Sequence, residues 1–360
     1  MEPDPRANDP TSGWAATLPR RLVVTGGAGF IGSAFVRLVL QLADPPQVTV
    51  LDALTYAGNL ANLAQVAAHP RYTFVHGNIC DAAAVEPLAA AADCIVNFAA
   101  ESHVDRSILD PGAFIQTDVY GTFVLLEAAR RHQHPRFLQV STDEVYGDVA
   151  APHLSQEGDP PRPRSPYAAS KVGGEMQCWA YHETFGVPVL ITRGSNTYGP
   201  YQYPEKIIPL FVTNALEERP LPIYGGGTAV RDYLHVDDHA RGIAMVLAQG
   251  QPGEVYNIGQ GDDPVDGLTI ARTVLRLTGR GERLMTHVQD RPGHDRRYAL
   301  DTARMRRLGW APTRDLGRGL EETVRWYEQR RDWWEPIKSG AFWEFYRRNY
   351  RPLAGATTPP

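Results

Sequence analysis

The fold is decided by residues 21–32, which read RLVVTGGAGFIG. The first five residues are mostly apolar and β-branched, as in a buried strand, and residues 33–42 continue with apolar side chains at helical spacing. Between them, Gly26 permits a tight turn, Gly29 lets the backbone approach a pyrophosphate, and Gly32 lets the helix pack on the strand. The free N–H groups at the start of that helix attract phosphate oxygens. The stretch therefore predicts the dinucleotide-binding turn of a parallel sheet.

Asp52 ends the next predicted strand, Gln47–Asp52, twenty residues after Gly32. A carboxylate at this point accepts hydrogen bonds from ribose hydroxyls. It would also repel the 2′-phosphate of NADP, so NAD is the expected cofactor. A glycine turn without a ligand is the alternative, but it does not account for the strand, the helix and the carboxylate at their expected positions.

Apolar runs alternate with helical patterns beyond this point, which predicts an α/β fold with a Rossmann-like, doubly wound parallel sheet. The expected strands are 72–75, 94–98, 137–140 and 187–192, and the expected helices include 113–132 and 170–185. Residues 254–259 are predicted to form a strand that returns to the same sheet.

The remaining segments predict a smaller, discontinuous α/β lobe that binds the substrate. We expect an NAD-binding domain from residues 21–195 plus about 235–262, and the lobe from about 196–234 plus 263–350. Residues 1–20 are rich in Pro, Asp and Ala and are expected to be a disordered tail, and residues 351–360 a second tail.

Composition excludes several classes of protein. The 360 residues carry 36 Lys and Arg against 41 Asp and Glu, so no broad cationic surface is expected for nucleic acid or for a membrane. Apolar runs are too short for a transmembrane helix, and the N-terminus has no secretory pattern. Cys80, Cys94 and Cys178 form no CxxC pair, so neither a metal site nor a disulfide framework is expected. A cytoplasmic location follows as the expectation.

Tyr167 and Lys171 are a candidate catalytic pair, because a spacing of four places both side chains on one face of a helix. A neighbouring ammonium would stabilise the phenolate and lower the pKa of the tyrosine. Tyr167 could then take a proton from a sugar hydroxyl as hydride leaves the same carbon. A surface pair without a role is the favoured interpretation of the motif alone. Its position after the fifth strand of a dinucleotide fold favours catalysis.

Thr142, Asp143 and Glu144 directly follow a predicted strand, at the edge of the sheet where ligands bind. Two carboxylates in one cleft tend to separate in pKa, so that one is an acid and the other a base. Hydride transfer alone does not need such a pair, whereas elimination of water does. The alternative is a solvated turn in which the aspartate caps a helix.

These motifs resemble the extended short-chain dehydrogenase/reductase superfamily, and within it the dTDP-glucose 4,6-dehydratases. The resemblance runs from about residue 21 to 350. Its further segments are AAESHVDRS (99–107), STDEVYG (141–147), SPYAASK (165–171), SNTYGPYQYPEKIIP (195–209), RDYLHVDDHARG (231–242), YNIG (256–259) and DRPGHDRRYA (290–299). STDEVYG is the most specific, since related 4-epimerases usually carry small residues in place of the two carboxylates.

The resemblance implies a role for each candidate residue. Tyr167, with Lys171 and Thr142, would drive oxidation of the sugar at C4, Glu144 would remove the C5 proton, and Asp143 would protonate the C6 hydroxyl as it leaves. The implied NAD contacts are Gly26, Gly29, Phe30, Ile31, Gly32, Asp52, Asn78, Ile79, Ala99, Ala100, His103, Thr117, Tyr167 and Lys171. The implied contacts to a dTDP-hexose are His103, Thr142, Asn196, Lys206, Arg231, Asn257, Arg291 and His294. A homodimer is also implied, in which helices 113–132 and 170–185 pair with their symmetry mates as a four-helix bundle.

Three positions depart from the family pattern. Thr197 stands where a second Asn is frequent, Gly194 where a Cys is frequent, and Asn78 where an acidic residue is common. The first two leave the preference for nucleotide base and sugar open. A UDP-hexose 4,6-dehydratase, an NAD-dependent 4-epimerase and a non-catalytic sensor of NAD or a sugar nucleotide are the alternatives.

Overall fold

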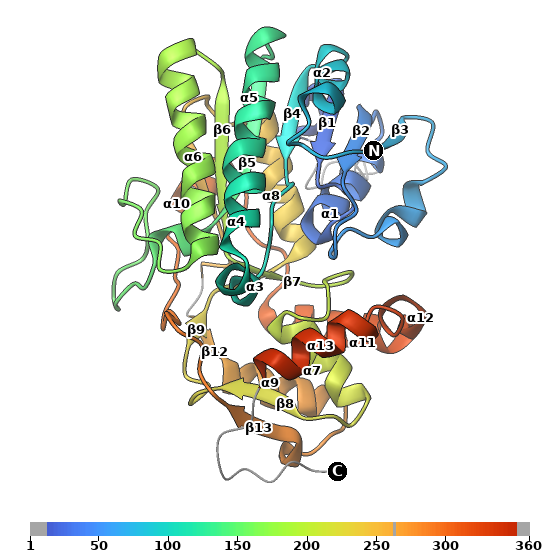
Figure 1. Cartoon of the computed structure of the whole chain (residues 1–360), viewed down its shortest axis with the longest axis vertical. Coiled ribbons are helices and arrows are strands. Elements are labelled where there is room, and N and C mark those ends of the chain that lie inside the picture. The colour runs from blue at the N-terminus through green and yellow to red at the C-terminus, as the bar shows by residue number, and fades with distance from the viewer. Residues whose placement is uncertain (1–12, 262–263, 351–360) are drawn as a thin grey trace, which may run out of the picture.

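The computed structural model describes residues 13–261 and 264–350, and it has a central parallel sheet with a smaller lobe below it in Figure 1. Seven strands pair in the order β11-β6-β5-β4-β1-β2-β3, and every neighbouring pair is parallel. The strands are β1 (Arg21–Thr25), β2 (Gln47–Asp52), β3 (Tyr72–His76), β4 (Cys94–Asn97), β5 (Arg136–Thr142), β6 (Val189–Gly194) and β11 (Val255–Ile258). The doubly wound α/β sheet is confirmed, and so is the returning strand, β11.

Helices cover both faces of this sheet because successive strand residues point to opposite faces. Leu22 and Val24 pack into the core on one face, and Val23 packs into the core on the other. One face carries α1 (Phe30–Leu40) and α8 (Val236–Gln249), and the other carries α2 (Ala82–Ala90), α5 (Thr122–Arg131) and α6 (Pro166–Phe185). The helix expected at 113–132 is a continuous helical segment formed by α4 (Pro111–Phe114), the π-helical η3 (Ile115–Gly121) and α5.

The strand order reverses between β1 and β4. The helices that follow these two strands, α1 and α5, lie on opposite faces of the sheet, and ligands of open α/β sheets bind in the crevice that this leaves at the carboxyl edge. The first glycine turn follows β1 directly, while α3 (Val104–Leu109) comes soon after β4. The topology therefore places the predicted phosphate turn at the crevice.

The predicted disordered tail is wrong for residues 13–20. Residues Ala15–Thr17 form a 3-10 helix, η1, and the Trp14 side chain is 1% exposed. Trp14 and Leu18 belong to the core on the α1–α8 face. Burial of one large aromatic ring outweighs the polar composition around it. Residues 1–12 and the second expected tail, 351–360, lie outside the described residues.

The smaller lobe is built from several separate segments, because the chain enters it more than once. Its helices are α7 (Ile207–Leu216), α9 (Gly267–Leu277), α11 (Leu316–Gln329), α12 (Arg331–Trp334) and α13 (Gly340–Asn349). Its short strands pair as β7 (Asn196–Tyr198) with β10 (Tyr233–His235), β8 (Leu221–Tyr224) with β13 (Met285–Val288), and β9 (Val230–Arg231) with β12 (Val265–Asp266). Phe211, Tyr327 and Trp334 lie at the centre of its core.

The predicted lobe boundary is wrong for the segment around α10 (Ala303–Arg307). Met305 and Trp310 are buried in the core of the NAD-binding domain, not in that of the lobe. The Trp310 indole N–H donates to the Asp238 carbonyl at the start of α8 (3.2 Å). The chain thus crosses back to the first domain before it re-enters the lobe at α11.

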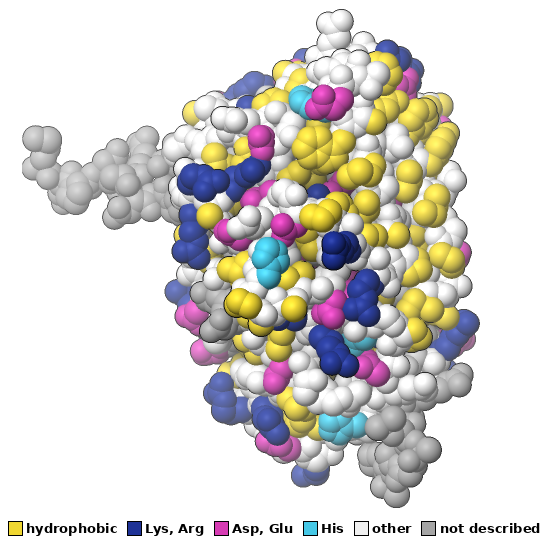
Figure 2. Space-filling model, turned by 90° about the vertical axis from the view of Figure 1, so that its left-hand side faces the viewer, with side chains coloured by type: hydrophobic (Ala, Val, Ile, Leu, Met, Phe, Trp, Pro, Cys, Tyr) yellow, Lys and Arg dark blue, Asp and Glu magenta, His cyan; other side chains and the backbone are white. Residues whose placement is uncertain are grey.

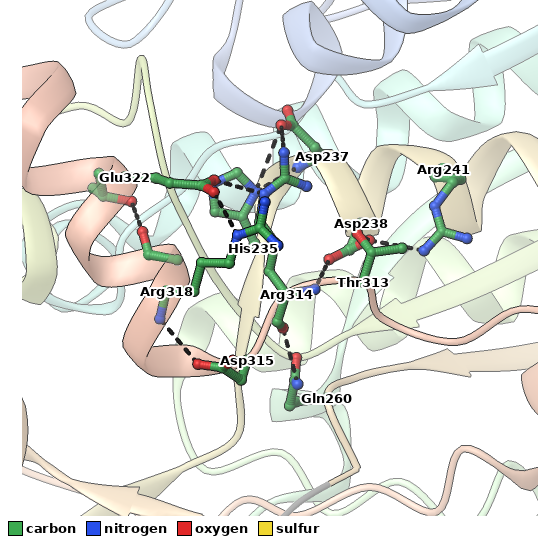
Figure 3. Close-up of polar contacts among 12 residues, drawn as sticks. His235, Asp237, Asp238, Arg241, Gln260, Thr313, Arg314, Asp315, Arg318 and Glu322 are labelled. Carbon is green, nitrogen blue, oxygen red and sulfur yellow. Dashed lines mark hydrogen bonds and ion pairs between the residues drawn. The ribbon is translucent and has the colours of Figure 1, made fainter. Parts of the chain in front are cut away.

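A polar cluster joins the NAD-binding domain to the lobe just before α11 begins (Figure 3). Arg314 lies between the start of α8 and the side of α11, with its guanidinium 3.1 Å from Asp237 Oδ2 and 2.7 Å from Glu322 Oε2. Asp238 accepts hydrogen bonds from the Arg314 backbone N–H (3.1 Å) and from the Thr313 hydroxyl (2.8 Å). These contacts hold the lobe against the carboxyl edge of the sheet.

Candidate active site

The glycine turn has the shape that a pyrophosphate needs. Gly26 has φ +67°, and a Cβ there would lie 2.5 Å from the Ala99 backbone nitrogen. A Cβ on Gly32 would lie 2.4 Å from the Gly26 carbonyl oxygen, so the helix approaches the turn closely. Gly29 is the N-cap residue of α1 and leaves the first N–H groups of the helix open. These residues fit a dinucleotide phosphate at the helix N-terminus.

Asp52 is held in place by the same turn. Its carboxylate accepts hydrogen bonds from the backbone N–H of Ala28 (2.9 Å) and of Leu54 (2.8 Å). Burial raises the pKa of Asp52, and those two hydrogen bonds oppose the rise. Each oxygen keeps a second lone pair, so the carboxylate can still accept from ribose hydroxyls.

A cavity of about 330 Å³ follows this edge of the sheet. It is lined by all the residues predicted for the cofactor except His103, namely Gly26, Gly29, Phe30, Ile31, Gly32, Asp52, Asn78, Ile79, Ala99, Ala100, Thr117, Tyr167 and Lys171. Thr142, Asp143 and Glu144 line the same cavity. The structure thus brings the phosphate turn and the candidate catalytic residues to one continuous space.

Tyr167 and Lys171 lie on the first turns of α6, which begins with Ser165 as its N-cap. The Lys171 ammonium donates to the Val140 carbonyl of β5 (3.2 Å), so the lysine is fixed against the sheet. The predicted lowering of the Tyr167 pKa is not found in this structure. Burial raises that pKa well above its usual value, with further contributions from Glu144 and Asp118, while a hydrogen bond with Thr142 lowers it.

Asp143 and Glu144 form the first half of η4 (Asp143–Tyr146), a single 3-10 turn at the end of β5. The Thr142 hydroxyl accepts the Glu144 backbone N–H and so caps this turn (3.3 Å). Asp143 is buried, and its Oδ2 has no hydrogen-bond partner. A solvated turn, the alternative to catalysis, would leave this carboxylate in water.

The two carboxylates have different electrostatic surroundings. Burial raises the pKa of Asp143 well above its usual value, and the neighbouring carboxylates Glu144 and Asp232 raise it further. Burial also raises the pKa of Glu144, but Arg291 and Lys206 act in the opposite direction. These surroundings favour the protonated form of Asp143 more than that of Glu144, whose carboxylate is favoured by nearby cations.

A second cavity, of about 150 Å³, opens toward the lobe. Glu144, Asn196 and Lys206 line both cavities, so the two adjoin at the reacting groups. The residues predicted for the substrate that line the second cavity are His103, Asn196, Lys206, Arg231, Arg291 and His294. His103, which was predicted for the cofactor as well, lines only this second cavity.

The basic residues of the second cavity differ in how many of their hydrogen-bond donors already have a partner in the protein. Arg231 donates to the backbone carbonyls of Val230 (2.8 Å) and Asp295 (2.7 Å), whereas Arg291 keeps a buried Nε without a partner. Burial, with the charge of Arg291, lowers the pKa of His294 to about 4. His294 is consequently a neutral side chain at pH 7, and arginine and lysine carry the positive charge.

Asn257 lines neither of these two cavities, and its role in substrate binding stays a prediction. Its side chain is 0% exposed and donates to the carbonyls of Ser155 (2.9 Å) and Asp301 (3.2 Å). Its amide oxygen accepts a hydrogen bond from the Tyr146 hydroxyl (2.7 Å). The position follows from β11, which returns to the edge of the sheet beside β6.

Four tyrosines of the second cavity were not predicted, namely Tyr224, Tyr233, Tyr298 and Tyr350. Tyr224 donates to Asp105 (2.8 Å), and the ring of Tyr298 lies 4.2 Å from the Arg231 guanidinium carbon. Tyr224 ends an apolar run and precedes three glycines, and Tyr298 is the last residue but one of the segment 290–299, so these two carried a local signal. What brings them together is the lobe topology, which no local pattern gives.

The departures from the family pattern at Gly194 and Thr197 meet at one histidine. A Cβ on Gly194 would lie 2.3 Å from His239 Cε1, so the imidazole occupies the space that a side chain would fill. The Thr197 hydroxyl lies 2.7 Å from His239 Nδ1. Burial lowers the pKa of His239 to about 4, and the residue lines the first cavity as a neutral ring.

Comparison with known proteins places this geometry in a family. Residues 23–323 match the family described as GDP-mannose 4,6 dehydratase. A dTDP-glucose 4,6-dehydratase of Streptomyces niveus is 51% identical over 89% of this chain and 96% of that protein. A dTDP-glucose 4,6-dehydratase 1 of Escherichia coli is 44% identical over 92% of this chain and 99% of that protein.

Solved structures agree with the sequence comparison. DesIV (dTDP-glucose 4,6-dehydratase) from Streptomyces venezuelae, with NAD and TYD bound, has a TM-score of 0.85 and 50% identity, and covers 88% of this chain and 100% of that one. A UDP-glucose 4-epimerase of Thermus thermophilus in complex with NAD has a TM-score of 0.80 and 30% identity over 86% of this chain and 99% of that one. The chain therefore belongs to the GDP-mannose 4,6 dehydratase family, and within it to the dTDP-glucose 4,6-dehydratases.

Proposed function

We propose that this protein converts dTDP-glucose to dTDP-4-keto-6-deoxyglucose with NAD as a bound cofactor. The observation that carries the proposal is the pair Asp143–Glu144, the first buried and the second partly buried, in the same cavity as Tyr167 and the phosphate turn. An enzyme that only transfers hydride has no use for a second acid–base pair at the reacting carbons. Sequence relatives named dTDP-glucose 4,6-dehydratase support the choice of sugar nucleotide.

The residues of the first cavity fit NAD, because the glycine turn receives a pyrophosphate and Asp52 receives ribose hydroxyls. When bound, NAD supplies a hydride acceptor at C4 of the sugar and a hydride donor at C6. Tyr167 takes the proton of the C4 hydroxyl as the C4–H bond breaks. The positive charge of Lys171, and that of an oxidised nicotinamide, favour the phenolate that burial alone disfavours.

Elimination is assigned to the two carboxylates. The C4 ketone acidifies the C5–H bond, and Glu144 takes that proton while the electron pair forms the C5–C6 double bond. Asp143 gives its proton to the C6 hydroxyl, which leaves as water. Hydride then adds to C6 and a proton returns to C5, so one water is lost and no net oxidation occurs. A neutral Asp143 beside a charged Glu144 suits these opposite roles.

The second cavity is assigned to the nucleotide. Arg291 and Lys206 supply the charge that a pyrophosphate requires, and the unpartnered Arg291 Nε is a free donor there. Tyr224 and Tyr298 offer aromatic faces to the base. All three cysteines are free thiols, which supports a cytoplasmic enzyme. Among the described residues, none of the helices has the length and apolar character needed to cross a membrane.

We also propose a homodimer formed through η3, α5 and α6. Ile115 and Phe185 are large apolar side chains that are 54% and 53% exposed. Tyr120, Phe123 and Met176 extend the same exposed surface along these helices. Figure 2, which faces the side of the molecule that carries α6, shows hydrophobic side chains spread over its upper part. A second copy would cover this surface with the same helices, as a four-helix bundle.

A panel of nucleotide sugars tests the proposed reaction. The purified protein is incubated with dTDP-glucose and, separately, with UDP-, CDP- and GDP-hexoses, and the products are identified by NMR in deuterated water. The proposal expects a 4-keto-6-deoxy product from dTDP-glucose with solvent deuterium at C5. A C4 epimer without deuterium at C5 would identify a 4-epimerase instead, and absence of product from every sugar would overturn the proposal.

A further inference from the structure

Helix α6 carries one more polar residue, Glu175, in register with the two catalytic ones. Tyr167, Lys171 and Glu175 follow at a spacing of four, so their side chains form one stripe along the helix. The first two line the first cavity. Glu175 lies one turn further on, is 0% exposed and contacts no cavity among those described.

Glu175 is fully paired with an arginine of the sheet. Arg193 of β6 donates from Nε to both carboxylate oxygens (3.1 and 3.2 Å) and from Nη2 to Oε2 (2.6 Å). Its side chain is also buried, at 2% exposure for the residue. Arg193 pairs in register with Ser141 of β5, which directly precedes the catalytic segment.

The arginine reaches from this pair to the catalytic turn. Its guanidinium carbon lies 4.7 Å from the ring centroid of Tyr146, the last residue of η4. The Tyr146 hydroxyl donates to Asn257 Oδ1 (2.7 Å), and the Asn257 backbone N–H donates to Glu157 Oε1 (3.1 Å). Tyr146 is thus fixed through both its ring and its hydroxyl, two residues after Glu144.

We propose that the Glu175–Arg193 pair, acting through Tyr146, is a positioning link that holds the Asp143–Glu144 turn against the Tyr167–Lys171 helix. The link rests on the proposed function, because it joins the groups assigned to oxidation with those assigned to elimination. None of its three residues lines a described cavity, so it acts through other residues rather than on the sugar.

A buried charge pair is a poor device for stability alone. Desolvation of both ions opposes their attraction, and well-packed apolar residues can serve as well or better. A planar guanidinium with a bidentate partner is rigid, however, and fixes whatever packs on its face. The geometry therefore favours orientation over stability as the purpose of the pair.

The test separates the two chemical steps in a single turnover, with enzyme in excess of dTDP-glucose. Oxidation is followed by the absorbance of the reduced cofactor. Elimination is followed by the amount of product in samples quenched at successive times. Tyr146→Leu removes the ring beneath the guanidinium, Glu175→Gln removes the charge pair, and Arg193→Lys keeps the charge without the planar face. The matched control is Tyr181→Leu. Tyr181 is a buried tyrosine of α6, the helix that carries Glu175, and its hydroxyl donates to the Glu127 carboxylate (2.7 Å).

The link predicts that elimination slows about 10- to 100-fold in Tyr146→Leu and Glu175→Gln while oxidation changes little, because small misplacements cost this much. Reduced cofactor should then accumulate in these two variants. It should also accumulate in Arg193→Lys, to a smaller extent. If Glu175→Gln does not fold, Tyr146→Phe, which keeps the ring and loses only the hydroxyl, should still slow elimination selectively.

Equal losses of both steps, or an unchanged ratio of the two rates in every folded variant, would overturn the link. The same partition in Tyr181→Leu would also overturn it, since any buried tyrosine would then have this effect. A parent enzyme that forms no 4-keto-6-deoxy product would contradict the proposed function itself, which is a separate outcome.

Discussion

Asp143 is the residue on which the proposed chemistry most depends. It is buried, one of its oxygens has no partner, and a second carboxylate adjoins it. Asp143→Asn keeps the shape and removes the acidic proton. We expect elimination to slow about 10²- to 10⁴-fold, the usual contribution of a general acid, while C4 oxidation persists. Single-turnover absorbance should show reduced cofactor accumulating, and an equal loss of both steps would contradict the assignment.

The pH dependence of elimination follows from the two raised pKa values. Asp143 acts as an acid only while protonated, so the rate should fall as pH rises through its pKa. Glu144 acts as a base only while ionised, so the rate should fall as pH drops through its pKa. Arg291 holds that second pKa down. Arg291→Met should therefore move the acidic limb of the profile to higher pH at saturating substrate. An unmoved acidic limb would show that Glu144 is not the base.

Several of these residues could be assigned from sequence because each sits in a strong local context. Gly26, Asp52 and Tyr167 lie at the ends of strands or the start of a helix, where position alone determines what a side chain faces. The buried contacts of Asn257 could not be predicted, because a motif gives a residue type but not the direction in which it points. The pKa of Tyr167 was mispredicted, since the desolvation of its hydroxyl and the nearness of Glu144 and Asp118 arise from tertiary structure that the motif does not give.

At the scale of elements, the glycine turn between β1 and α1 should control cofactor retention. A Cβ on Gly32 would meet the Gly26 carbonyl oxygen at 2.4 Å, between backbone groups that have little room to move. Such overpacking costs about 1–3 kcal/mol, and a cost of that size to the NAD-bound form would weaken affinity about 5- to 150-fold.

Gly32→Ala should therefore lose bound NAD, measured as cofactor released per chain after denaturation and by titration of the stripped protein. Gly281→Ala is the control, because nothing lies within 4 Å of a Cβ there. Equal NAD content in the two variants would show that the turn does not hold the pyrophosphate.

The sheet could be predicted as elements because its strands are buried on both faces and read as apolar runs. The strands of the lobe could not be predicted, since they have only two to four residues and pair with partners far along the chain. Trp14 and Trp310 escaped prediction for the same reason. Each is a single aromatic residue whose burial depends on a distant helix, α8, and not on its neighbours in sequence.

At the scale of the whole molecule, the exposed apolar surface on α5 and α6 predicts the oligomeric state. The double variant Ile115→Glu/Phe185→Glu places charges on two of its most exposed apolar side chains. Light scattering should give the mass of a dimer for the parent protein and of a monomer for the variant, with unchanged far-UV circular dichroism. A monomeric parent would contradict the dimer and leave the helices to pack on the sheet alone.

The NAD-binding domain and the lobe enclose adjoining cavities that form one reaction space. In the proposed reaction, the hydride that leaves C4 of the sugar returns to C6 of the same sugar. dTDP-glucose carrying deuterium at C4 tests this most directly, with the product analysed by NMR and mass spectrometry. We predict dTDP-4-keto-6-deoxyglucose with the deuterium at C6. A product without deuterium at C6, or recovery of a sugar that has kept its C6 hydroxyl, would contradict the proposed reaction.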